Sequence, residues 1–125
     1  MTRKEALAEL IAKVEAGEAS GKFGPIMRGH MDFDKILEAS RAYNGSLDAA
    51  KALHEAVLPG WAVERITMWP GPNNGCAAYL WGTHEKRGER WHHPEDGRSD
   101  ATAETPARAW LLAILRALHS MEGEQ

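Results

Sequence analysis

The chain has 125 residues, with 15 basic and 18 acidic side chains and a formal net charge of −3. This charge argues against a dedicated binder of duplex DNA, because such proteins usually carry a strong basic excess. The length fits one domain, residues 1–125, and the only cysteine, Cys76, excludes an internal disulfide and fits a reducing cytoplasm. No apolar run reaches the roughly 18 residues of a membrane span, and the charged N-terminus lacks a signal-peptide core.

The first helix is expected to start at Thr2, which forms a capping box with Glu5. Apolar residues then follow at the i, i+3, i+4 and i+7 spacing of one helix face, and Gly17 is expected to end the helix. The segment 18–31 is glycine-rich and contains a proline, so it is predicted as a loop. Its apolar residues are expected to pack against the domain: Phe23, Ile26 and Met27.

Two further helices are predicted before residue 61. Asp32 or Asp34 is expected to cap the second helix, and the Asn-Gly pair at 44–45 to end it. Ser46 is expected to cap the third helix, which the Pro-Gly pair at 59–60 ends. The residues predicted to face the core are Phe33, Ile36, Leu37, Ser40 and Tyr43 in the second helix, and Leu47, Ala50, Leu53, His54 and Val57 in the third.

The stretch 61–82 is predicted to form the main β-structure. Two runs rich in Val, Ile, Trp and Tyr flank a Pro/Gly/Asn cluster, which is typical of a hairpin. The small residues at 76–78 indicate that another element packs closely against the second strand, where Cys76 is expected as a small buried residue rather than a reactive thiol. Neither face of the first strand is purely polar, so both are expected to be at least partly covered. Alternation predicts Trp61, Val63, Arg65, Thr67 and Trp69 on one face, and Ala62, Glu64, Ile66 and Met68 on the other.

A third strand is predicted within 83–93. A turn at 86–88 would let residues 90–92 run back beside Trp81, which extends the hairpin to a meander. The following segment, 94–100, is polar and rich in turn-forming residues, so it is expected to be a surface loop.

The last helix is the most hydrophobic one. Thr105 followed by Pro106 is a strong helix start, and the helix is expected to run to about Met121. The order of elements predicts an α+β fold, a small antiparallel β-hairpin or three-stranded meander packed by N-terminal helices and one C-terminal helix, with helices on both faces of the sheet. The apolar stripe of the last helix suits one face: Trp110, Leu111, Ile114, Leu115, Leu118 and Met121.

Two stretches, NGSLDAAKALHEAVLPGW (44–61) and ATAETPARAWLLAILRAL (101–118), carry a resemblance to a known family. With a tryptophan-bearing hairpin between them, they resemble small phage and prophage proteins of the phage α-β-α (ABA) sandwich type. LAELIAKVEA (7–16) is similar to the lead helix of such proteins. The resemblance implies a fold and a phage-like origin, and hence the cytoplasm of a bacterial host cell, but it brings no activity and no catalytic residues.

Basic and aromatic residues gather between Trp81 and Arg98, a mixture typical of a nucleotide site. Arginine binds phosphate through paired hydrogen bonds, and aromatic faces stack on bases with ~1–3 kcal/mol each. Four acidic residues balance the four basic ones here, so a solvated charged turn is the alternative interpretation. The candidate ligand-binding residues are Trp81, His84, Arg87, Arg90, Trp91, His92 and Arg98.

Other chemistries find less support in the sequence. A metal site built from His84, His92 and His93 is not expected, because adjacent residues of a strand point to opposite faces and no known ligand spacing is present. Cys76 and His84 would form only part of a nucleophile–base arrangement, and no nucleophile elbow or phosphate-binding loop occurs. Catalysis is therefore the less favoured interpretation, and we assign no catalytic residues and expect no cofactor.

The sequence thus predicts a non-enzymatic, phage-type binding protein that sequesters a nucleotide-like host defence signal. The alternative is a protein–protein interaction module that self-associates or inhibits a host protein, with exposed tryptophans as interface anchors. A homo-oligomer is expected in either case, because the short chain carries an excess of large aromatic residues. The expected partner is a small anionic or nucleotide-like ligand, or a host protein, but neither duplex DNA nor a membrane.

Overall fold

The computed structural model describes residues 1–69, 75–86, 89–92 and 98–122, with the backbone alone at 83–86 and 89–92. These ranges contain helices and antiparallel strands, which confirms the predicted α+β class. In chain order the elements are α1 (Arg3–Ala16), α2 (Phe23–Met27), α3 (Phe33–Tyr43), α4 (Leu47–Val57), β1 (Ala62–Trp69), β2 (Gly75–Trp81), β3 (Thr83–Lys86), β4 (Glu89–His92), β5 (Arg98–Ala103) and α5 (Pro106–Glu122).

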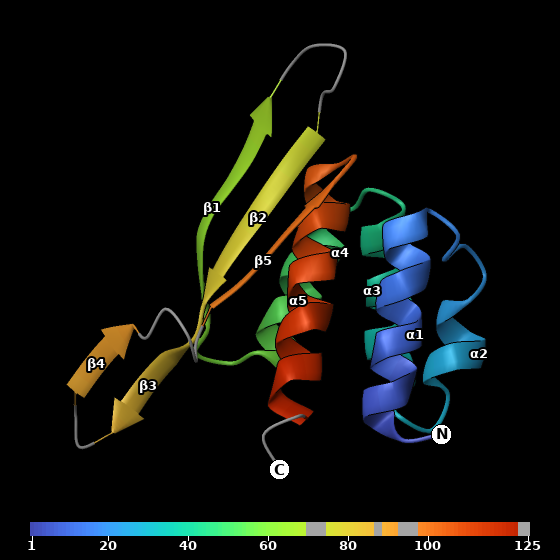
Figure 1. Ribbon diagram of the computed structural model, residues 1–125, viewed down its shortest axis with the longest axis horizontal. Helices are drawn as coiled ribbons and strands as arrows, with labels where there is room; N and C mark the ends of the chain where they lie inside the picture. The colour runs from blue at the N-terminus through green and yellow to red at the C-terminus, as the bar shows by residue number, and fades with distance from the viewer. Residues whose placement is uncertain (70–74, 87–88, 93–97, 123–125) are drawn as a thin grey trace.

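The main sheet is three-stranded and antiparallel in the order β1-β2-β5, and β3 pairs with β4 in a separate ribbon that projects beyond it (Figure 1). The predicted meander is therefore present, but the identity of its third strand was wrong. Trp81 lies opposite Arg98, whereas residues 90–92 run back beside β3. One residue, Gly82, connects β2 to β3, but five residues, 93–97, connect β4 to β5. Because the two connections differ in length, the pairing of β2 with β5 cannot continue in the same register into the pairing of β3 with β4.

Helix α5 forms the middle layer of the molecule. Its one side packs against β2 and β5, and its other sides contact α1, α3 and α4 (Figure 1). A helix that is apolar nearly all round is expected to be buried. The predicted contact between the last helix and the sheet is confirmed, but the buried surface is wider than one stripe: Ala107, Ala109, Trp110, Leu111, Leu112, Ala113, Ile114, Leu115, Ala117 and Leu118.

The sheet face toward α5, here called the inner face, is built from small residues. Cys76, Ala78 and Ala101 are buried on it, so α5 approaches the strands closely. Ser99 is also buried there, and its Oγ donates a hydrogen bond of 2.7 Å to the carbonyl of Ala113 in α5. The prediction that small residues of β2 mark close packing is confirmed, as is the burial of Cys76.

A β-bulge in β1 changes which side chains share a face. Val63 lies opposite Leu80, and Arg65 lies opposite Tyr79. The two partners in β2 are consecutive residues, whereas the two residues of β1 have one additional residue between them. Glu64 is the additional residue, and it lies on the same face as Arg65. The predicted face assignment is therefore wrong before Arg65, where strict alternation fails, and correct from Arg65 to Trp69.

The predicted starts of α1, α4 and α5 are confirmed, whereas Asp32 precedes α3 without a capping hydrogen bond from its side chain. Thr2 and Glu5 form the reciprocal capping box of α1, and Ser46 Oγ accepts a hydrogen bond of 3.1 Å from the amide of Ala49 in α4. Thr105 Oγ1 accepts from the amide of Arg108 at 3.2 Å. Gly17 ends α1 with a φ of 73°, a left-handed conformation that favours glycine.

The predicted inner faces of α3 and α4 are only partly correct. Phe33 is 74% exposed, and Leu37 and Leu47 are exposed as well. Tyr43 is buried and Ile36 packs partly against the core, as predicted, but α3 also turns Ala39 and Ala42 inward. The buried face of α3 is therefore rotated relative to the predicted face, because small alanines let the helix pack closely.

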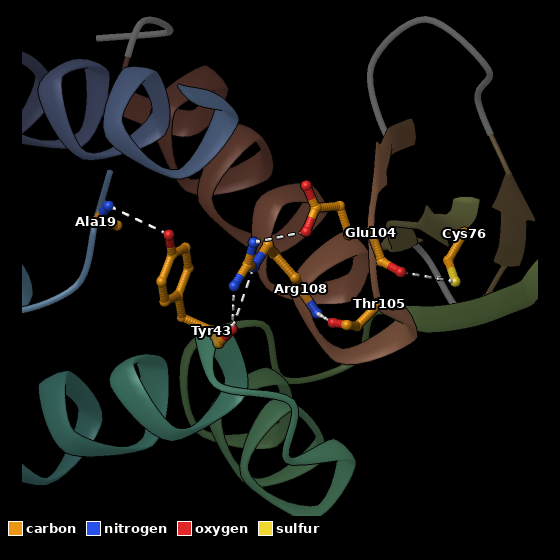
Figure 2. A network of polar contacts seen from close by, with 6 residues as sticks. All are labelled: Ala19, Tyr43, Cys76, Glu104, Thr105 and Arg108. Atoms are coloured by element: carbon orange, nitrogen blue, oxygen red, sulfur yellow. Dashed lines mark hydrogen bonds and ion pairs between the residues drawn. The ribbon is translucent and has the colours of Figure 1, made fainter. Parts of the chain in front are cut away.

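Arg108 connects the helical layers to the end of β5 (Figure 2). Its Nε and one terminal nitrogen donate to the carbonyl of Tyr43 at 3.2 and 3.1 Å, and its guanidinium lies 3.9 Å from the centre of the Tyr43 ring. The Tyr43 hydroxyl in turn accepts from the amide of Ala19 at 3.3 Å. One arginine thus satisfies a carbonyl at the end of α3 and holds α3 against α5.

Candidate binding face of the sheet

The face of the sheet that points away from α5, here called the outer face, carries no helix in the described part of the chain. Figure 1 shows the helices gathered on one side of the three strands. The expectation of helices on both faces is therefore wrong, because α1 to α4 pack against α5 and against one another instead of crossing the sheet. The outer face bears large polar and aromatic side chains, which we examine as the candidate site: Glu64, Arg65, Tyr79, Trp81, Arg98 and Asp100.

Two arginines and two aromatic rings alternate across the outer face. The Arg65 guanidinium lies 4.4 Å from the centre of the Tyr79 ring. The Arg98 guanidinium lies 5.9 Å from the Tyr79 ring and 5.7 Å from the Trp81 ring. All three distances fall within the range of cation–π attraction. We call this arrangement the Arg65–Tyr79–Arg98–Trp81 ladder.

Two acidic residues orient the ladder. Glu64 accepts a hydrogen bond of 2.5 Å from the indole nitrogen of Trp81, a contact made available by the β1 bulge. Asp100 lies 3.7 Å from Nε of Arg98. These two carboxylates balance the two guanidiniums, so an anionic ligand would have to compete with Asp100 for Arg98.

A shallow hollow of about 460 Å³ adjoins the ladder at β5, lined by Arg98, Ser99, Asp100 and Arg116. Arg116 comes from α5, and one of its terminal nitrogens donates to the carbonyl of Asp100 at 2.9 Å. Its other terminal nitrogen pairs with Glu15 of α1. The lining thus includes one arginine from β5 and one from α5, and a phosphate-sized anion bound there would have to compete with Glu15 for Arg116.

The structure brings together Trp81 and Arg98 from the predicted site, directly opposite each other in the β2–β5 ladder. His84 lies opposite Trp91, and His92 lies opposite Thr83, in the backbone of the β3–β4 ribbon. Beyond these pairings, the predictions for the remaining candidates concern side chains outside the described residues: His84, Arg87, Arg90, Trp91 and His92. The expectation that His84, His92 and His93 form no metal site also concerns side chains outside the described residues.

Sequence reasoning missed five residues of this site, one of which is Asp100, a residue that was predicted in a surface loop but belongs to β5. Tyr79 has the same strand parity as Trp81, so alternation alone could have placed it beside Trp81. Arg65 and Glu64 reach the same face only because of the bulge, for which the sequence gives no clear signal. Arg116 lies on the helix that covers the opposite face, and only the tertiary structure brings it to β5.

A second concave region lies between α2 and α3, away from the sheet. This groove of about 610 Å³ is largely apolar, and the exposed Phe33 side chain forms part of its wall. Its lining contains a single charged residue, Arg28. It offers no combination of rings and paired cations, so the outer face remains the stronger candidate for an anionic ligand.

Comparison of the chain with protein-family models, with curated proteins and with solved structures finds no match. Among the described residues, no helix has both the length and the apolar character that crossing a membrane requires. The geometry of the outer face is therefore the feature of the molecule that bears most directly on function.

Proposed function

We propose that this chain is a non-enzymatic binding protein whose outer sheet face takes a small, anionic, nucleotide-like ligand. The observation that carries the proposal is the Arg65–Tyr79–Arg98–Trp81 ladder on a sheet face without a covering helix. Buried cation–aromatic clusters usually support a core, whereas Arg65 and Arg98 are exposed here. Their flat faces and hydrogen-bond donors are accessible to a ligand.

The chemistry of the ladder fits the two halves of a nucleotide. A base stacks on an aromatic ring or on a guanidinium plane, with ~1–3 kcal/mol per stacked base. A phosphate binds paired arginine nitrogens, and the hollow lined by Arg98 and Arg116 shares Arg98 with the ladder. Because Arg98 belongs to both places, it is the residue that would link base recognition to phosphate recognition.

The β3–β4 ribbon adds further residues to the proposed binding site. It follows β2 after Gly82, and its strands contain four of the other predicted ligand-binding residues: His84, Arg90, Trp91 and His92. In the phage-type interpretation the ligand is a nucleotide-like signal of host defence, and binding removes it from the cytoplasm of a bacterial host. The resemblance of the two sequence segments supports the phage-like origin alone, and the nucleotide-like ligand is supported by the rings and arginines of the ladder.

The alternative function, a protein–protein interaction module, has its own supporting observation. Three apolar side chains of β1 are exposed on the opposite edge of the sheet from β5: Val63, Met68 and Trp69. Exposed aromatic and apolar residues of this kind serve as interface anchors.

Thermal-shift measurements with mononucleotides and cyclic dinucleotides test the proposed function. A ligand at a hundred times its Kd stabilises the folded state by about 2.7 kcal/mol, so binding raises the melting temperature. The variant Arg98→Ala should weaken binding by about tenfold or more, because a charge-assisted contact is lost. Arg41→Ala is the matched control, since Arg41 is an exposed arginine paired with a glutamate on α3, away from the sheet.

The proposal fails in either of two ways. One is that no nucleotide changes the melting temperature of the wild-type protein. The other is that Arg98→Ala binds as tightly as Arg41→Ala, which would remove the outer face from consideration.

A further inference from the structure

Strand β1 lies at one edge of the three-stranded sheet, and within the described residues its strand partner is β2 alone. It is also poorly covered. Met68 is 70% exposed and Trp69 40% exposed, because α5 packs mainly against β2 and β5 and leaves β1 outside the helical layers (Figure 1). An exposed apolar edge strand is a template for pairing with another chain.

The two halves of β1 differ in how well they are protected against such pairing. The bulge at Glu64 interrupts the first half, and bulges are a common means of blocking an edge. The second half, Arg65–Trp69, pairs with β2 in unbroken register and contains no proline. Its single charge belongs to Arg65, whose guanidinium is held over the Tyr79 ring. These five residues form the regular part of this edge.

We infer that the segment Arg65–Trp69 pairs antiparallel with the same segment of a second copy, about a two-fold axis at Thr67. An axis at this residue is the one that uses all five regular positions of the edge. The contact is self-complementary, as a two-fold dimer requires, and it joins two three-stranded sheets into one of six strands.

The cross-strand pairs created by this register are all of favourable kinds. Thr67 lies opposite Thr67 of the second copy, and Ile66 lies opposite its Met68 on the inner face. Arg65 lies opposite Trp69 on the outer face, so no two like charges meet in this register. An axis at Arg65 would instead place two like charges opposite each other, which destabilises a sheet.

The contact also covers apolar side chains. On the inner face, Ile66 and Met68 of the two copies form an apolar cluster along the edge of the α5 layer, and the exposed thioether of Met68 becomes covered.

Sedimentation velocity of the full chain without nucleotide tests the inference independently of the proposed ligand. The wild-type protein should dimerise, and Thr67→Lys and Thr67→Glu should each raise the dimer Kd by about tenfold, because like charges meet at the axis. An equimolar mixture of the two variants should restore dimers, since Lys and Glu then face each other. Phe33→Lys, an equally drastic change at an exposed residue of α3, is the control and should dimerise as the wild type does.

Met68→Lys gives a second route if either Thr67 variant fails to fold, because its side chain is already 70% exposed and opposes Ile66 of the second copy. It too should weaken the dimer about tenfold. The inference is overturned if the wild-type protein stays monomeric, if folded Thr67 and Met68 variants dimerise as strongly as Phe33→Lys, or if the Lys–Glu mixture forms no more dimer than either variant alone.

Discussion

The two faces of the three-stranded sheet are built from opposite kinds of residue. The inner face carries mainly small side chains such as Ala78 and Ala101, and α5 lies directly on it. The outer face carries long or aromatic side chains that contact one another sideways, as Arg65 and Tyr79 do. A face that a helix covers needs small residues for close approach, whereas a face without a helix can carry a layer of mutual side-chain contacts. We therefore expect the inner face to contribute most to the stability of the fold, and the side chains of the outer face to be the ones that a ligand can contact.

The largest expected difference between the faces comes from two adjacent residues of β2. Leu80 is fully buried on the inner face and Tyr79 is half-buried on the outer face. Leu80→Ala should lower the free energy of unfolding by about 2–5 kcal/mol, because it leaves a cavity beneath α5. Tyr79→Ala should lower it by about 1 kcal/mol, through loss of its contacts with the arginines. Urea denaturation measures both values, and equal losses would show that the outer face supports the fold as strongly as the inner one.

Two indole hydrogen bonds provide a second, smaller contrast. Trp110 Nε1 donates to Nδ1 of the buried His54 at 3.1 Å, and His54 Nε2 donates to the carbonyl of Trp61 at 2.8 Å. Trp110→Phe should destabilise the protein by about 1–3 kcal/mol, because a buried acceptor loses its partner. Trp81→Phe breaks the corresponding bond to Glu64 on the outer face.

Water can replace the lost partner of Glu64 but not that of His54. Trp81→Phe should therefore change the unfolding free energy by less than about 1 kcal/mol. Thermal unfolding of the two variants measured side by side checks the contrast, and a larger loss for Trp81→Phe would reverse our ranking of the two faces.

The smallest effect is expected where both partners lie in water, at the start of α1. The Thr2 amide donates a hydrogen bond to the carboxylate of Glu5, and this bond lowers the pKa of Glu5 below its usual value. A hydrogen bond from the Thr2 hydroxyl lowers this pKa further. Because the folded-state pKa is lowered, the stabilisation is present above the unfolded-state pKa and disappears as pH falls through the folded-state pKa. Glu5→Gln should thus have a slightly lower melting temperature than the wild type at neutral pH, with the gap closing at strongly acidic pH. A gap that stays constant with pH would exclude this charge as its origin.

Features fixed by a few neighbouring residues could be predicted from the sequence. The capping box at Thr2 and the Thr105–Pro106 helix start need only local hydrogen bonds and a fixed φ, so the pattern is sufficient. The proximity of Trp81 and Arg98 was also anticipated, although its cause differs, because Arg98 belongs to β5 and not to a loop.

Features that depend on packing between distant segments could not be predicted. Strand β5 has the sequence RSDATA, whose inward residues are Ser and Ala, so it lacks the large apolar alternation that identifies a strand. Its burial follows from the close approach of α5. The bulge at Glu64 likewise depends on the pairing of β1 with β2, and without it the Arg65–Tyr79 half of the ladder cannot be inferred.

The central position of α5 bears on how the chain reaches its folded state. This helix follows every other described element in the sequence, yet both the sheet and the bundle of α1, α3 and α4 bury their apolar surfaces against it. During synthesis, residues 1–105 would leave the ribosome with no surface on which to complete a core. Because contacts such as those between α1 and α5 join segments far apart in sequence, we expect late, all-or-none folding and a period in which the nascent chain depends on chaperones.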